Sequence, residues 1–112
     1  MASTTFTGPV TSLNGFKSGT GLAIKLVLGA SATLDFASIA AAGSADLTIT
    51  VAGAGINNVV SLGLPAAPTA GLVFQAFVSA ANTVTVRATN ITAGAVDAVS
   101  ATYSVVVTQV AV

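Results

Sequence analysis

The sequence contains no cysteine and no histidine. The absence of cysteine excludes disulfides and thiolate metal sites, and the absence of histidine removes the usual protein ligand of zinc, copper and haem iron. A catalytic triad also loses its usual base. The acidic residues are Asp35, Asp46 and Asp97, which lie far apart in the sequence and do not resemble the paired carboxylates of a glycosidase. We therefore expect no enzymatic activity, no metal and no cofactor.

Charged residues are scarce as well. Three basic residues balance three acidic ones, so that only 5% of the chain is charged and the formal net charge is zero. An average soluble domain carries about 25% charged residues. So few basic groups argue against binding to nucleic acid or to an anionic membrane surface. A chain that is 54% hydrophobic also has little to keep its copies apart, so we expect it to associate with itself.

Long apolar runs are missing too, because no segment reaches the roughly 18–20 apolar residues of a membrane-spanning helix. Residues 22–32 (LAIKLVLGASA) imitate a secretion signal, with an apolar core that ends in small residues. Lys25 interrupts this core, however, and apolar residues alternate from Leu22 to Leu28. We interpret the segment as a β-strand.

The sequence is rich in short runs of β-branched and apolar residues, separated by Gly, Pro and Asn. The clearest run is 45–52, in which Leu47, Ile49 and Val51 are expected to face the core. The spacing of the turn residues is typical of a sandwich or barrel. We predict one all-β domain over residues 22–112, an antiparallel β-sandwich or Greek-key barrel. The predicted strands are residues 22–28, 30–36, 45–52, 58–63, 72–79, 82–90 and 100–110.

Two features of the predicted strands bear on association. The last strand, with Tyr103 to Val110 nearly continuously apolar, lies either in the centre of a buried sheet or at an edge or face that another subunit covers; we prefer the second arrangement. Phe74 and Phe77 are three residues apart and should therefore point to opposite faces of one strand. One of them is then a candidate interface anchor.

Residues 1–21 differ from the rest of the chain, because they are rich in Thr, Ser and Gly and lack regular alternation. We predict an extended N-terminal arm. Its apolar side chains should dock on a neighbouring molecule or on the domain itself. The candidate contact residues in the arm are Phe6, Val10, Leu13 and Phe16.

Arg87 is the one charge embedded in a strong predicted strand. It either contacts another subunit or lays its apolar stem over the sheet with its guanidinium group in water. A protein with so few charges has few other means of orienting an interface, so Arg87 stays a candidate contact residue. Residues 90–92 (Asn-Ile-Thr) match a glycosylation sequon, but a turn after a strand is the stronger interpretation.

Long stretches of the sequence resemble a module of tailed-bacteriophage virion proteins. They are TLDFASIAAAGSADLTITVAGA (33–54) and VSLGLPAAPTAGLVFQAFVSAANTVTVRATNITAGAVDAVSATYSVVV (60–107). The opening MASTTFTGPVTSLNGF is similar to the start of such phage structural proteins. The resemblance covers most of the chain, but its motifs specify a compact β domain and no chemistry.

The resemblance implies a capsid decoration (cement) protein on the surface of the virion. It implies a homotrimer that contacts the major capsid protein through its N-terminal arm, so the candidate contact residues would touch capsid or neighbouring subunits. A tail or fibre component that binds a host receptor or glycan, and a self-assembling tube subunit, remain alternatives.

Overall fold

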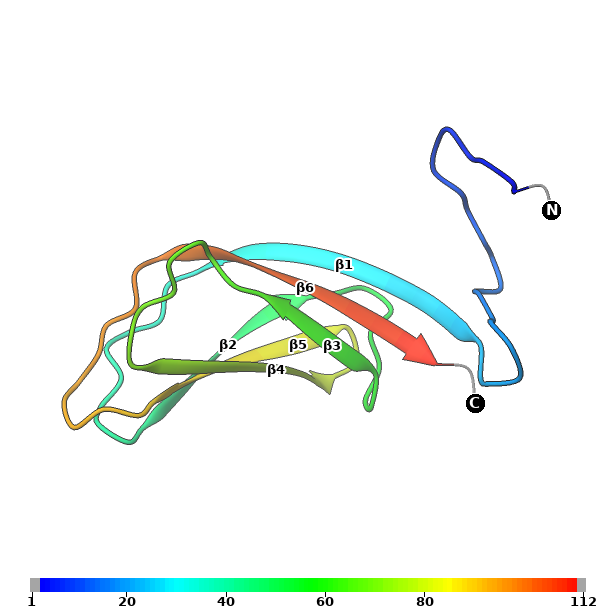
Figure 1. The fold of residues 1–112 in the computed structure, drawn as a ribbon. Helices are drawn as coiled ribbons and strands as arrows, with labels where there is room; N and C mark the ends of the chain where they lie inside the picture. The colour runs from blue at the N-terminus through cyan, green and yellow to red at the C-terminus, as the bar shows by residue number, and fades with distance from the viewer. Residues whose placement is uncertain (1–2, 111–112) are drawn as a thin grey trace.

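The structure is a computed structural model that describes residues 3–110, and within this range it contains strands and loops but no helix (Figure 1). Residues 1–2 of the predicted arm and residues 111–112 of the predicted domain lie outside the described residues. The strands are β1 (Ile24–Leu34), β2 (Ser44–Thr50), β3 (Val59–Gly63), β4 (Leu72–Ala80), β5 (Thr83–Asn90) and β6 (Ala101–Val110).

The strands form two three-stranded antiparallel sheets, with the orders β1-β6-β3 and β2-β5-β4. Only β4 and β5 follow each other within one sheet, and every other connection passes from one sheet to the other. One shared core joins the inner faces of both sheets. The predicted all-β sandwich is therefore confirmed.

The alternation in the sequence decides which side chains enter this core. In β2 and just beyond it, Ile49 and Val51 are buried while Asp46, Thr48 and Thr50 are exposed, as predicted. Because side chains point to alternate faces of a strand, one run of residues supplies both a core face and a solvent face. Valines hold four of the eight buried positions of β5 and β6.

Three aromatic rings fill one part of the core. The Phe36 and Tyr103 ring centroids lie 6.1 Å apart and meet edge to face, and the Phe74 ring lies 5.5 Å from that of Tyr103. Such offset contacts add to the gain from burying the rings. Phe74 thus points inward, whereas Phe77 lies opposite Thr85 on the outer face, which confirms that the two side chains take opposite faces.

The structure corrects two expectations about the strands. The predicted strands 22–28 and 30–36 form a single strand, β1, because Gly29 stays extended and pairs with Val106 instead of turning the chain. The last strand, β6, is the central strand of its sheet, so the preferred edge position is wrong. Its outer face remains exposed, for example at Val106.

Phe74 and Phe77 make a matched test of this architecture. We expect Phe74→Ala to lower the free energy of unfolding by about 3 kcal/mol, because it removes a ring from the aromatic cluster. Phe77→Ala should cost roughly half as much, since that ring lies on the outer face. Chemical denaturation of both variants would measure the difference, and equal losses would contradict the assigned faces.

Candidate interaction surfaces

The N-terminal segment, residues 3–21, lies outside both sheets and extends away from the start of β1 (Figure 1). Its large apolar side chains face solvent. Leu13 is 88% exposed and Phe16 is 61% exposed, and Phe6 and Val10 are exposed as well. The four predicted contact residues of this segment are therefore accessible. What they contact stays a prediction.

One local contact ties the segment to the sandwich. Phe16 and Ile24 exchange two backbone hydrogen bonds, of 2.8 and 2.7 Å between nitrogen and oxygen. Gly15 makes this contact possible, because its φ of +84° favours glycine and a Cβ there would clash with the carbonyl oxygen of Ile24. The Ser12 hydroxyl donates a hydrogen bond of 2.7 Å to the carbonyl oxygen of Gly15. Residues 12–16 are thus held against the first residues of β1.

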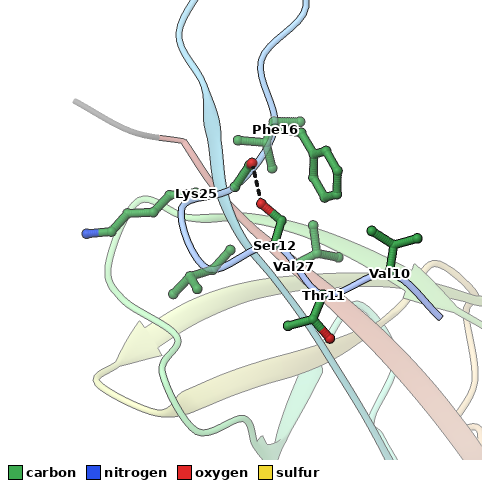
Figure 2. A pocket seen from close by; sticks show the side chains of 9 residues that line it. Val10, Thr11, Ser12, Phe16, Lys25 and Val27 are labelled. Carbon is green, nitrogen blue, oxygen red and sulfur yellow. Dashed lines mark hydrogen bonds between the residues drawn. The ribbon is translucent and has the colours of Figure 1, made fainter.

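A groove of about 330 Å³ lies between this part of the segment and β1 (Figure 2). Val10 and Phe16 line it from the segment, and Ile24, Leu26 and Val27 line it from β1. The groove therefore joins two of the predicted contact residues to apolar side chains of the sheet.

Arg87 lies elsewhere, on the outer face of the β2-β5-β4 sheet. Its Nε and Nη2 atoms donate hydrogen bonds of 2.8 and 2.9 Å to the two carboxylate oxygens of Asp46, on the neighbouring strand. Its guanidinium carbon lies 5.1 Å from the centroid of the Phe77 ring, on the other neighbouring strand. Arg87 therefore links three strands of its own sheet.

This contact has an electrostatic consequence for both charged groups. The hydrogen bonds from Arg87 lower the pKa of the Asp46 carboxyl, and its positive charge acts in the same direction. The same hydrogen bonds raise the pKa of the Arg87 guanidinium. The structure does not bring Arg87 together with the contact residues of the N-terminal segment, and its predicted contact with another subunit stays a prediction.

The outer face of the β1-β6-β3 sheet has a different character. From Val27 to Thr33 in β1 and at the paired positions of β6 and β3, the outward side chains are Gly, Ser, Thr and Val only. Val27 and Val59 flank Thr108 in one row, and Val106 lies on the central strand in the next row. We refer to this surface as the uncharged face. Lys25 lies on edge strand β1 at a β-bulge.

Asn90, the first residue of the Asn-Ile-Thr sequon, has a structural role. Its side chain is 1% exposed, and Nδ2 donates hydrogen bonds of 2.9 Å to the carbonyl oxygens of Ile39 and Gly94. Its Oδ1 accepts a hydrogen bond of 2.8 Å from the backbone nitrogen of Thr92. The amide thus joins the β1–β2 loop to the β5–β6 loop. The sequence indicated a turn here but not this link between distant loops.

Residues 3–110 contain no group of His, Cys, Asp or Glu side chains placed to hold a metal ion. No helix in the described part of the chain is long and apolar enough to cross a membrane. Comparison with known protein families, with curated proteins and with solved structures finds no match.

The link made by Asn90 can be measured through stability. We expect Asn90→Ala to lower the free energy of unfolding by about 2–3 kcal/mol, because it leaves buried carbonyl and amide groups without partners. Asn14→Ala is the matched control, since Asn14 is exposed, and it should change stability by less than about 0.5 kcal/mol. An Asn90→Ala protein as stable as the control would contradict the structural role.

The Asp46–Arg87 pair predicts a dependence of stability on pH. The pKa of Asp46 is below its ordinary value of 3.8 in the folded protein, so its contribution is complete above that value and is lost as the pH falls through the folded-state pKa. Asp46→Asn should therefore lower the melting temperature slightly at pH 7 and make no difference at strongly acidic pH.

Thermal unfolding followed by circular dichroism across this pH range would test the Asp46 prediction. Asp97→Asn is the control, because it makes the same charge change at an exposed position outside the ion pair. A pH-independent difference between wild type and Asp46→Asn would contradict the assigned pairing.

Proposed function

We propose that this chain is a non-enzymatic structural protein of a tailed-bacteriophage virion, which associates with itself and decorates and stabilises the capsid. The N-terminal segment contacts capsid subunits in addition to neighbouring copies. The observation that carries this proposal is the set of exposed apolar side chains on a segment that projects from a compact sandwich (Figure 1).

The dimensions of the chain support association. Its radius of gyration is 17.4 Å, whereas a compact domain of this length has a radius of about 13 Å. It exposes 7109 Å² of surface at a mass of 10.7 kDa, whereas a compact protein of that mass exposes about 5,500 Å². The excess of about 1,600 Å² is roughly twice the ~800 Å² that each partner contributes to a standard protein interface. The surplus surface is therefore sufficient for a specific contact.

The nature of that surface supports a structural role. Its apolar residues include Phe6 and Leu13 on the segment, the groove beside β1 and the valines of the uncharged face. A protein that covers a repeating lattice needs many contacts of this kind between identical units. Together with the resemblance of residues 33–54 and 60–107 to phage virion modules, these surfaces favour capsid decoration over a receptor-binding tip.

The segment provides the test of this function. We expect the double variant Phe6→Ser/Leu13→Ser to weaken binding to capsids that lack the protein by at least about tenfold, because both side chains are exposed in the free chain and would be buried in the complex. Val73→Ser is the matched control, since Val73 is also an exposed apolar residue but lies on the β2-β5-β4 sheet. Co-sedimentation with capsids measures the binding.

Capsids covered with the wild-type protein should also resist heating better than bare capsids. A wild-type chain that stays in the supernatant at every concentration would contradict the proposed function. Unchanged binding by the Phe6→Ser/Leu13→Ser variant would contradict the role assigned to the N-terminal segment.

A further inference from the structure

The unpaired charges of the chain are separated along the length of β1. Lys25 is the second residue of this strand, and Lys17 lies in the loop that returns from Phe16 to Ile24. Both lysines are exposed. The end of the sandwich that carries the N-terminal segment is therefore positive, and we call it the basic end (Figure 1).

The opposite end of the sandwich is acidic. Asp35 directly follows the last residue of β1, and Asp97 follows Val96, which is hydrogen-bonded to Ile39 in the β1–β2 loop. Both carboxylates are exposed, and Figure 1 shows the two loops at the same end of the molecule. At about 3.3 Å per residue, β1 separates Lys25 from Asp35 by roughly 33 Å. We call the end with these loops the acidic end.

The remaining two charged side chains do not change this separation of positive and negative charge. Asp46 and Arg87 neutralise each other at 2.8 Å, and within residues 3–110 they form the only ion pair. A chain with a formal net charge of zero thus has one end that carries both lysines and another that carries both unpaired aspartates. Two copies in the same orientation, end to end, bring opposite charges together, whereas like ends repel each other.

Both ends also expose apolar side chains beside these charges. At the basic end, Leu22 and Phe16 are more than half exposed, and at the acidic end Ile91 and Val99 are exposed to a similar degree. Apolar contact supplies affinity and the charges supply orientation, which is the usual division of roles in an interface. The basic end of one copy is therefore complementary in charge to the acidic end of a second copy, and both ends offer apolar side chains for the contact.

We propose that neighbouring copies associate head to tail, with the basic end of one copy on the acidic end of the next. The proposal rests on the self-association in the proposed function and adds its orientation and its residues. Lys17 and Lys25 face Asp35 and Asp97 of the neighbour, and Leu22 packs near Ile91 and Val99. Such an interface is heterologous, so it closes into a ring such as a trimer if the rotation between copies permits, and otherwise forms a filament.

A charge exchange tests this orientation. The basic-end variant is Lys17→Glu/Lys25→Glu and the acidic-end variant is Asp35→Lys/Asp97→Lys, all at exposed positions. Each variant alone should dissociate about tenfold more readily than wild type in 50 mM salt, because like charges then meet at the interface. An equimolar mixture of the two double variants should associate more strongly than either variant alone. Alternating copies bring complementary ends together at every contact of a filament and at two of the three contacts of a trimer.

Sedimentation velocity of the full chain over a range of concentrations measures the association, and circular dichroism checks that each variant is folded. Asp46→Asn/Arg87→Gln is the control, because it alters two charged residues without changing either end, and it should associate like wild type. Raising the salt to 1 M should weaken association of the wild-type chain and reduce the differences between variants.

The outcomes separate this proposal from the proposed function. Weak association of each charge variant with recovery in the mixture supports the head-to-tail contact. Variants that associate as well as wild type, or a mixture that does not recover, overturn the head-to-tail contact, while co-sedimentation of the wild-type chain with capsids would still uphold the proposed function. A wild-type chain that is monomeric at every concentration overturns both the head-to-tail contact and self-association.

Discussion

The packing of two small sheets against each other is the interaction on which the rest of the structure depends. A three-stranded sheet can bury only one face in this way, so half of each strand must face outward. The core takes the valines, leucines and aromatic rings, with Tyr103, Val105 and Val107 of β6 among the most buried. The remaining positions then decide how the molecule meets its surroundings. In this chain, very few of them are charged.

Because charge is scarce, Thr, Ser, Gly, Ala and Val are the commonest residues on the surface. These small side chains are less strongly hydrated than charged groups and allow another backbone to approach closely. Depletion of charged residues is also a feature of interface cores. The charges that exist are used in two ways. Arg87 and Asp46 link adjacent strands and Arg87 also covers Phe77, whereas the lysines and the other aspartates lie unpaired at opposite ends. The N-terminal segment adds the largest exposed apolar side chains beside one of those ends.

The sequence predicted the core well, because alternation decides it locally. The inward positions of β2 and the opposite orientations of Phe74 and Phe77 follow from period two alone. Gly29 misled the prediction, since a glycine in an extended conformation leaves a strand intact. The central place of β6 depends on pairing between residues far apart in the chain, which local pattern does not encode.

For the candidate contact residues, too, the sequence predicted part of the result and the folded structure supplied the rest. The sequence indicated Phe6, Val10, Leu13 and Phe16 as contact residues on a neighbour or on the domain itself, and only the structure shows that they are exposed in the single chain. The ion pair of Arg87 required the register of β2 on β5, and the role of Asn90 required two loops to meet. Neither the ion pair nor the link made by Asn90 lies within one segment of the sequence. Both depend on how distant segments pack together in the sandwich.

Self-association is the central claim of this account, and the solution mass of the purified chain tests it most directly. Light scattering at several concentrations should give a multiple of the 10.7 kDa chain mass, because the surplus apolar surface is buried between copies. A mass of one chain at every concentration would contradict the account, since the extended segment and the uncharged face would then remain in water.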